Sequence, residues 1–442
     1  MRYFPHTKED IGRMLAVVGA KSLDDLFADI PPECLLDRPL GLPGPISEWE
    51  LVRRLEEMAA EAGGDWKVFV GAGSQPHHIP AVVPALAGRS EFLTAYTPYQ
   101  PEISQGTLQA IFEFQTLIAR LFGLAVANAS LYDGATAMAE AVLMAGRIRG
   151  GRNVAVSELA HPHWRETLTA YLAPVPDARI LALPSGPDGR TDFSRLGELP
   201  NPSVLVVQSP NFLGAFEDLP AAAEHVHAAG GLLAAGISEP FALGLAKSPG
   251  ALGADIAFGE GQSLGLPQSF GGPGLGLLAA RAEYMRQMPG RLVGETTDTR
   301  GRRGFVLTLS AREQHIRRAR AVSNICSNAG HSALTAAVFM AAIGADGFRK
   351  TAQANLDLAE RLKAGLLALG FRRLNDAPTF NEFALRVPDW FPARHAELQK
   401  RRILAGLPLA GYGRAWADAW LFGVTETAGK DGVDALLREM RP

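Results

Sequence analysis

Ser203-Val204-Leu205-Val206-Val207-Gln208 is the stretch that decides the fold class. Its centre is an unbroken run of aliphatic, mostly β-branched residues, which is typical of a strand buried on both faces of a sheet. Similar short apolar runs recur on both sides of it, separated by helical patterns. The other expected strands are Asn153–Val156, Arg179–Leu183, Leu232–Ala235, Ala254–Phe258 and Gly274–Ala279, with helices at Pro162–Leu172 and Ala221–Ala229. This alternation predicts an α/β fold with a mainly parallel sheet and helices on both faces.

The sequence before and after this α/β region predicts two further parts. Residues 1–65 are expected to form a helical arm, in which Ser47 and Glu50 make a capping box and Gly63-Gly64 ends the helix. Residues 321–442 are expected to form a small α+β domain. Its predicted elements are a long linking helix at Val322–Ile343, helices at Ala354–Leu369, Ala393–Ile403 and Asp431–Met440, and strands at Glu382–Val387 and Trp420–Val424. The predicted organisation is therefore 1–65, 66–320 and 321–442.

Composition narrows the class of protein. The 442 residues are 47% hydrophobic and 20% charged, which supports a sizeable core and argues against disorder. The net charge of −3 gives no electrostatic case for nucleic acid. Cys34 and Cys326 are the only cysteines, too few and too distant for a disulfide framework or a metal site. No signal pattern and no run of about 18 apolar residues is seen, so we expect a soluble, cytoplasmic protein without a membrane partner.

Three short patterns suggest a nucleotide, phosphate or metal site, and each has a simpler structural explanation. Val68–Gly73 runs into glycines but lacks the Lys-Ser/Thr of a P-loop. Gly134 precedes an Ala-rich helix, which suits a bound phosphate or merely a tightly packed helix start. The candidate metal ligands are His77, His78, His161 and His163. None has a carboxylate or cysteine cluster beside it in sequence, so no metal site is expected.

The most distinctive loop is Tyr96-Thr97-Pro98-Tyr99-Gln100-Pro101-Glu102. Pro98 and Pro101 fix φ and remove backbone donors, so the stretch is expected to be a stiff loop and neither a strand nor a helix interior. Such a loop can present several polar side chains in a fixed geometry, as binding loops on rigid scaffolds do. A surface turn whose tyrosines pack on the core is the alternative, and spacing alone leaves it open.

These motifs resemble the glycine-cleavage P-protein family (glycine dehydrogenase, decarboxylating), and specifically its N-terminal half, which many bacteria make as a separate subunit 1. The resemblance covers nearly the whole chain. It rests on the tyrosine loop with Ser104-Gln105-Gly106, and on Arg2–Thr7, Ala127–Gly134, Ser209–Gly214, Gly271–Gly274 and Arg312–Arg318. It implies a fold-type I pyridoxal-phosphate (PLP) enzyme architecture, like that of aspartate aminotransferase, with a mostly parallel seven-stranded sheet.

Enzymes of that type need a lysine for the Schiff base with PLP and an aspartate that keeps the pyridine nitrogen protonated. Aligned on Pro267 and Gly271–Gly274, this sequence has Gln262 at the lysine position. Gly236 stands where the aspartate would end its strand. Glutamine cannot form an imine, and glycine cannot hold a proton on the ring. The resemblance therefore implies a chain without catalytic residues of its own, with PLP bound covalently by a homologous partner, subunit 2.

The resemblance also implies an activity. Together with the PLP-carrying subunit 2, in an α2β2 complex, such a chain decarboxylates glycine and passes the aminomethyl group to the lipoyl arm of H-protein. The tyrosine loop would then complete the partner's site. Tyr96 and Tyr99 would orient substrate or cofactor, Gln100 would donate to a carboxylate or phosphate, and Glu102 would act as an acid or base or anchor the loop. Thr97 and Pro98 would lie in the same contact.

Other interpretations remain open at this point. Arg312, Arg317 and Arg318 suit phosphate or a partner carboxylate, although a solvated helix face is the favoured explanation. An independent PLP enzyme would need another lysine, and the nearest, Lys247, lies in a loop before the strand, which is the wrong place. A purely structural or regulatory pseudoenzyme that stabilises a PLP-enzyme partner is the second alternative. The tyrosine loop argues against it, because a scaffold does not need that set of polar side chains.

Overall fold

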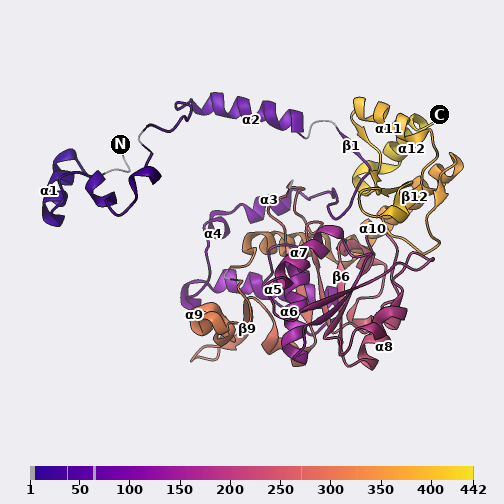
Figure 1. Ribbon diagram of the computed structural model, residues 1–442, viewed down its shortest axis with the longest axis horizontal. Helices are drawn as coiled ribbons and strands as arrows, with labels where there is room; N and C mark the ends of the chain where they lie inside the picture. The colour runs from indigo at the N-terminus through magenta and orange to yellow at the C-terminus, as the bar shows by residue number, and fades with distance from the viewer. Residues whose placement is uncertain (1–4, 37, 63–65, 270, 326, 442) are drawn as a thin grey trace. The chain divides into compact units, whose positions relative to one another are not determined.

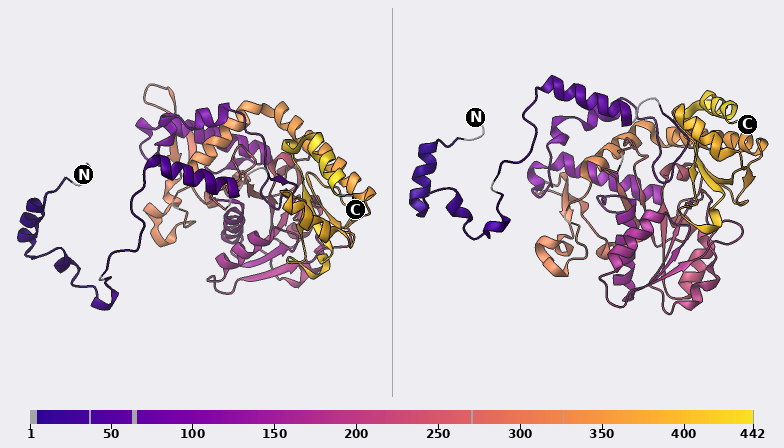
Figure 2. Two further views of the ribbon diagram at one scale, coloured as in Figure 1. Left: turned by 90° about the horizontal axis from the view of Figure 1, so that it is seen from above. Right: turned by 45° about the horizontal axis from the view of Figure 1, so that its top comes forward.

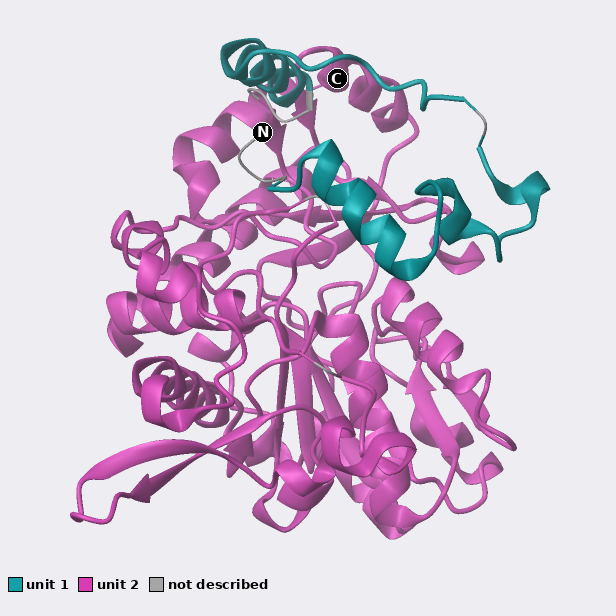
Figure 3. Ribbon diagram, turned by 90° about the vertical axis from the view of Figure 1, so that its left-hand side faces the viewer, with its two compact units in different colours: residues 1–64 teal, residues 65–442 magenta. Residues whose placement is uncertain are grey.

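The computed structural model describes residues 5–36, 38–62, 66–269, 271–325 and 327–441. They belong to two compact units, residues 1–64 and residues 65–442, which Figure 3 colours separately. Part of the opening motif Arg2–Thr7, the pair Gly63-Gly64 and Cys326 lie outside the described residues. The three-part division expected from the sequence stays a prediction.

The first unit consists of short helical segments. They are α1 (Lys8–Val18), η1 (Asp24–Phe27), η2 (Pro32–Cys34) and α2 (Glu48–Ala62). At the start of α2 the Glu50 carboxylate accepts hydrogen bonds from the Ser47 amide (3.0 Å) and hydroxyl (2.6 Å), so one half of the expected capping box forms. The segments α1, η1 and η2 have no buried residue. Their apolar side chains therefore do not make a core of this unit.

The second unit is built around a seven-stranded sheet in the order β2-β8-β7-β6-β5-β3-β4 (Figure 1). Its strands are β2 (Val126–Ala127), β3 (Asn153–Ser157), β4 (Arg179–Leu183), β5 (Val204–Gln208), β6 (Leu232–Ile237), β7 (Ile256–Glu260) and β8 (Gly276–Ala280). Strands β3 to β7 pair in parallel, and β8 runs antiparallel to both its neighbours. The predicted α/β fold with a mostly parallel sheet is confirmed; only the short edge strand β2 was not foreseen.

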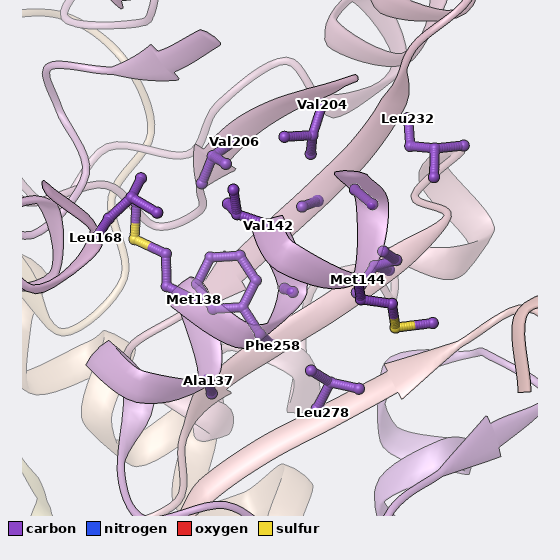
Figure 4. Close-up of a cluster of buried hydrophobic side chains, with 14 of the residues drawn as sticks. Ala137, Met138, Val142, Met144, Leu168, Val204, Val206, Leu232, Phe258 and Leu278 are labelled. Atoms are coloured by element: carbon purple, nitrogen blue, oxygen red, sulfur yellow. The ribbon is translucent and has the colours of Figure 1, made fainter. Parts of the chain in front are cut away.

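Alternate side chains along the strands serve two separate cores, as the strand period of two requires. The helices involved are α5 (Gln105–Phe122), α6 (Gly134–Arg149), α7 (Pro162–Leu172), α8 (Leu219–Ala228) and the first half of α10 (Gly330–Ala368). Val204, Val206 and Leu232 pack on α6 and α7, as Figure 4 shows. Leu205 and Leu233 face the other way, toward α8, while α5 and α10 cover the same face nearer β8. Helices thus lie on both faces (Figure 2).

The C-terminal part has its own small antiparallel sheet, in the order β11-β12-β15-β14. Its elements are β11 (Arg372–Arg373), β12 (Glu382–Arg386), α11 (Phe391–Lys400), β13 (Ile403–Leu404), β14 (Leu407–Pro408), β15 (Ala419–Gly423) and α12 (Gly429–Glu439). The expected linking helix Val322–Ile343 is wrong in its start, because α10 begins at Gly330. Its expected end at Ile343 is confirmed, because the helix breaks at Gly344, where φ is 60° and ψ is 178°. Glycine tolerates that angle, and a second helical segment follows the break and continues to Ala368.

By length and composition alone, α10 is apolar enough to cross a membrane, although 39% of its most apolar window is buried in the protein. One such helix is weak evidence, since the core helix of a soluble protein passes the same test. Its first half packs on α3 (Val82–Ala87) and α5, and its second half packs on α12.

A β-hairpin of β9 (Leu292–Thr297) and β10 (Arg303–Thr308) was not predicted. It lies against α5, where Gln105 and Gln115 bond its backbone from the side. The remaining regular elements are β1 (Lys67–Val68), which pairs in parallel with β13, and the short helices α4 (Ser90–Leu93) and α9 (Gln314–Arg317). The hairpin, α4 and α9 surround the tyrosine loop and support it.

Candidate functional site

Gly236, where the resemblance implies that an aspartate is missing, lies near the end of β6, and a side chain there would clash with Phe258. A Cβ built there would lie 2.8 Å from Cζ and 3.0 Å from Cε2 of Phe258. Phe258 is fully buried and contacts Trp164, with ring centroids 5.9 Å apart. Figure 4 shows its ring among side chains of α6. The space beside Gly236 is therefore filled by the protein's own aromatic core.

Gln262, where the resemblance implies that a lysine is missing, has both ends of its side-chain amide hydrogen-bonded. Its Nε2 donates to the Leu266 carbonyl (2.9 Å), and its Oε1 accepts from the Gln75 amide (2.9 Å). The residue is buried. Both ends of the amide thus tie the 262–266 turn to the loop around residue 75, and Gln262 acts as a structural bridge.

The N-terminus of α6, where a phosphate would suit the exposed amides, is filled by a carboxylate of the same chain. Glu260 accepts from the Gly134 amide (2.9 Å) with one oxygen and from the Gln262 and Leu275 amides (3.0 Å each) with the other. Burial raises the pKa of Glu260 to about 7, against the opposing effect of these backbone donors. The expectation that Gly134 merely starts a packed helix fits this geometry.

Because of the positions of Phe258, Gln262 and Glu260, the residues of this region do not fit PLP. Phe258 fills the space beside Gly236, the Gln262 amide is hydrogen-bonded at both ends, and Glu260 accepts from the Gly134 amide at the start of α6. Lys247, the alternative lysine, is exposed on the loop after the 3₁₀ turn Pro240–Gly244. The residues of this region therefore do not support cofactor chemistry.

A buried charged cluster lies between the large sheet and the C-terminal part. The His77 ring, 2% exposed, has Nε2 3.2 Å from Glu239 and Nδ1 3.0 Å from Glu426. Burial alone lowers the pKa of His77, but the charge of Glu239 and hydrogen bonds to Glu239 and Glu426 outweigh it and raise the pKa to about 9. Nearby, burial raises the pKa of Glu382 to about 7. The carboxylates absent beside His77 in sequence are supplied by distant segments, and they clamp its two nitrogens from different sides.

Among the other candidate metal ligands, His161 has a structural role. His161 is buried and its Nε2 lies 2.9 Å from the Ala72 carbonyl, to which it donates. Burial lowers the pKa of His161 to about 4, so the ring is neutral. Ala72 and Gly73 have positive φ, and the Ala72 amide donates to Glu382, so the glycine-rich run at 68–73 forms a turn around that carboxylate. Among the described residues no group of three His, Cys, Asp or Glu is arranged to hold a metal ion.

The tyrosine loop has the opposite character, because most of its side chains face solvent. Tyr96 is 80% exposed and Tyr99 is 52% exposed. Gln100 and Glu102 are exposed as well, while Pro98 is buried and anchors the loop. The segment is irregular up to Gln100 and then forms the 3₁₀ turn Pro101–Ile103, so the expectation of a loop that is neither strand nor helix agrees with the structure.

The end of the loop is fixed by the residue that follows it. The Gln105 side chain donates to the carbonyls of Pro101 (2.7 Å) and Phe305 (2.8 Å) and accepts from the Phe305 amide (2.9 Å). One glutamine therefore fastens the loop to strand β10. This fixes the loop's backbone without using any of its outward-facing polar groups.

A pocket of about 160 Å³ opens beside the loop. Its wall combines loop residues with side chains from α4, α5, α10 and the start of β9. The wall includes Tyr96, Thr97, Pro98, Arg291, Asn328 and His331. Arg291, 5% exposed, donates to the Tyr99 hydroxyl (3.1 Å), and its guanidinium carbon lies 5.4 Å from the Tyr99 ring centroid. The pocket thus has a cationic wall directly behind an exposed tyrosine.

The expected solvated face is wrong for Arg312. Its side chain is buried and donates to the carbonyls of Met288, Gly290 and Leu309. It thereby fixes the backbone on either side of Pro289 and the turn that leads to Arg291. Arg317 and Arg318 are exposed, as the favoured explanation predicted.

Sequence analysis did not identify Arg291, Asn328 or Gln105 as parts of the site. Arg291 and Tyr99 lie 192 positions apart, and no sequence spacing connects them. The only available signal was the Pro289-Gly290 turn before the apolar Leu292-Val293, which could have predicted a strand there.

Comparisons with known proteins agree with the geometry. The family model described as "Glycine cleavage system P-protein" matches residues 1–440. The "Probable glycine dehydrogenase (decarboxylating) subunit 1" of Desulfotalea psychrophila is 48% identical over 444 residues, covering 100% of this chain and 98% of the relative. A solved inhibitor-bound glycine decarboxylase (P-protein) has TM-score 0.89 and 50% identity, covering 100% and 99%. Glutamate decarboxylase of Lactobacillus brevis, at 14% identity, TM-score 0.68 and coverage of 92% and 94%, shares the fold.

Proposed function

The chain belongs to the glycine cleavage system P-protein family, and its fold is that of fold-type I PLP-dependent enzymes. From this premise we propose that it is the subunit of that enzyme which does not bind PLP. With a homologous PLP-carrying subunit 2 it decarboxylates glycine and transfers the aminomethyl group to the lipoyl arm of H-protein. The partner's PLP would supply the electron sink, and this chain would supply positioned polar groups.

One observation carries this proposal. The region where the fold would hold PLP is closed by Phe258, Glu260 and Gln262, while the tyrosine loop presents exposed polar side chains from a fixed backbone. A chain that had lost all activity would not need the second feature. The contrast therefore supports a role in completing another subunit's site. It also supports PLP being held by that subunit.

A second subunit is implied by the "subunit 1" in the names of the relatives. The first unit supports it, since it exposes large apolar side chains: Met14, Val17, Val18, Leu23, Leu26, Phe27, Leu35, Leu36, Trp49, Leu55 and Met58. Monomeric proteins rarely leave so much apolar surface without a partner. We assign this surface to subunit 2 in an α2β2 assembly, and we place the complex in the cytoplasm.

The loop residues would divide the work by their chemistry. The Tyr99 hydroxyl, and that of Tyr96, would orient glycine or the cofactor. Gln100 has an amide that donates to a carboxylate or phosphate, and Glu102 has a carboxylate that holds or moves a proton. Thr97 and Pro98 form the pocket wall beside them. These side chains act from a backbone fixed by Gln105, so no ordering step is needed when the partner binds.

The test is glycine decarboxylation by the reassembled two-subunit complex with H-protein. Tyr99→Phe, Gln100→Ala and Glu102→Ala should each approach the loss expected for one preorganised group, about 10²–10³-fold in turnover. Assembly, followed by size-exclusion chromatography, should be unchanged because these side chains are exposed. Gln109→Ala, an exposed amide on the neighbouring α5, is the matched control and should retain full activity. Activity within about threefold of wild type for all three loop variants, far below that loss, would favour the structural pseudoenzyme.

A further inference from the structure

We propose that Arg291 is a positioning residue that makes the Tyr99 hydroxyl a hydrogen-bond donor toward an oxyanion at the partner's site. This inference rests on the proposed function and adds a residue to it. Arg291 contacts Tyr99 directly: one guanidinium nitrogen lies 3.1 Å from the Tyr99 oxygen, and the guanidinium carbon lies 5.4 Å from the ring centroid.

The direction of this hydrogen bond follows from the donor inventory. Arginine has five N–H donors and no acceptor, so the Tyr99 oxygen must accept from it. The hydroxyl's own proton is then left for another acceptor. Tyr99 is 52% exposed, so that acceptor can come from outside the chain. A tyrosine bonded in this way is a donor in one defined direction.

The arginine is held in place by several elements. Its Nε lies 3.7 Å from a Glu313 carboxylate oxygen, and one terminal nitrogen lies 3.4 Å from the Asn328 side-chain oxygen. Arg312 fixes the backbone just before it through the Gly290 carbonyl. His315 meets the Tyr99 ring edge-on, with centroids 6.0 Å apart. Tyr99 therefore has a rigid, charged support although its own surface is exposed.

The charge behind the hydroxyl decides the class of acceptor. A guanidinium within hydrogen-bond distance of the tyrosine oxygen favours a negative acceptor over a neutral one, and a half-exposed site screens this preference only partly. Two oxyanions belong to the proposed reaction, the carboxylate of glycine and the phosphate of the partner's PLP. Both oxyanions accept a hydrogen bond from the hydroxyl. Loss of that donor weakens glycine binding in the first case and PLP binding in the second.

The experiment is a double-mutant cycle in the assembled two-subunit enzyme with H-protein. Tyr99→Phe, Arg291→Gln and the double variant are compared with wild type for kcat and KM of glycine decarboxylation. We expect each single variant to lose about 10²–10³-fold in kcat/KM. The double variant should be within about threefold of Tyr99→Phe, because residues that act through one another are not additive. Arg291→Lys, which keeps the charge and loses the planar fork, should lose less than Arg291→Gln.

Two arms separate the oxyanions. If Tyr99 donates to glycine, the fall in kcat is accompanied by a raised KM for glycine, and the complex keeps its PLP. If it donates to the phosphate, the PLP concentration that half-reactivates the apo complex rises while the glycine KM holds. A fall in kcat with neither change would contradict the oxyanion assignment.

A structural role is tested with Gln115→Leu. Gln115 is buried and bonds the amide and carbonyl of Val293, two positions after Arg291, without contacting Tyr99. Its losses in melting temperature and activity should be the same in the wild-type and Tyr99→Phe backgrounds. If the Arg291 variants behave like this control, so that their losses multiply with that of Tyr99→Phe, the positioning role is wrong while the loop's role stands. If Tyr99→Phe has full activity, the positioning role is wrong, and the loop's role is then decided by Gln100→Ala and Glu102→Ala.

Discussion

The buried region around Gly236, Glu260 and Gln262 and the tyrosine loop differ in how their polar groups are used. At the first, Gln262 has both amide ends bonded and Glu260 takes backbone donors from three residues, so every group serves the fold. At the second, Gln105 and Arg291 support the loop from inside and leave Tyr96, Gln100 and Glu102 facing outward. The polar side chains of the buried region bond within the chain, whereas the tyrosine loop is supported from its inner side only.

The difference shows where a chain can keep polar side chains for a partner at little cost to its own stability. A buried site without its ligand would leave polar groups unpaired, at about 1–3 kcal/mol each, so the space is refilled by residues that satisfy one another. An exposed loop carries no such penalty, since water satisfies its polar groups. Its side chains can therefore be retained for a partner at little cost to stability.

The largest effect is expected when an aspartate and a lysine are placed at Gly236 and Gln262. Gly236→Asp combined with Gln262→Lys should lower the free energy of unfolding by about 3–5 kcal/mol. The new Cβ would lie 2.8 Å from buried Phe258, and the lysine would leave the Gln75 amide without its acceptor. Urea denaturation measures the loss. After incubation with PLP and borohydride reduction, neither wild type nor variant should contain a pyridoxyl-lysine.

Gly272→Asp is the matched control for this experiment, because a Cβ at exposed Gly272 has no atom within 4 Å. It should leave stability within about 0.5 kcal/mol of wild type, as surface substitutions usually do. A double variant that is stable and takes up PLP stoichiometrically would show that the region is still a cofactor site.

The closed region also predicts a pH dependence centred on His77. Its folded pKa of about 9 lies above the ordinary value of 6.5, so its stabilisation is fully present below pH 6.5 and is lost as pH rises through 9. At about 1.4 kcal/mol per pKa unit, the loss is about 3 kcal/mol. Glu260 and Glu382, both near 7 in the folded state, lose their contributions between pH 4.5 and 7, which overlaps only the lower edge of this window.

The measurement is the difference in unfolding free energy between wild type and His77→Gln across pH 6.5 to 9.5. Groups that titrate equally in both proteins cancel, so the difference should shrink by about 3 kcal/mol over this range. Exposed His163 is the control, and His163→Gln should follow the wild-type curve throughout. A constant difference would mean that His77 is not held charged by Glu239 and Glu426.

The sequence predicted the parallel strands well because their signal is local. A run such as Val204–Val207 can be satisfied only inside a sheet, and the observed strand begins within one residue of the expectation. The end of the long helix before Gly344 was predicted correctly, because a glycine is a local signal, but its start was expected at Val322 and lies at Gly330. Only the resemblance indicated that Gly236 and Gln262 stand where other members have an aspartate and a lysine. The packing of Phe258 and the hydrogen bonds of Glu260 could not be predicted, because these contacts join segments far apart in the chain.

The smallest expected effect concerns the loop's own stiffness. Pro98 is buried and Pro101 opens a 3₁₀ turn, so both limit the loop's freedom before a partner arrives. Replacing either by alanine should leave the contacts of Arg291 and Gln105 intact and enlarge the set of conformations available to the loop. The cost of restricting one residue in this way is about 0.4–1 kcal/mol, which corresponds to about two- to fivefold in rate if the loop must be ordered in the transition state. Pro98→Ala should lose more, since its ring also fills space beside the pocket.

Steady-state decarboxylation by the assembled complex measures the rate, and the melting temperature of each variant serves as the control. A loss of 10²-fold or more from either proline, as large as that expected for Tyr99→Phe, would mean that the backbone of the loop, and not its hydroxyl and amide groups, is what the partner's site requires.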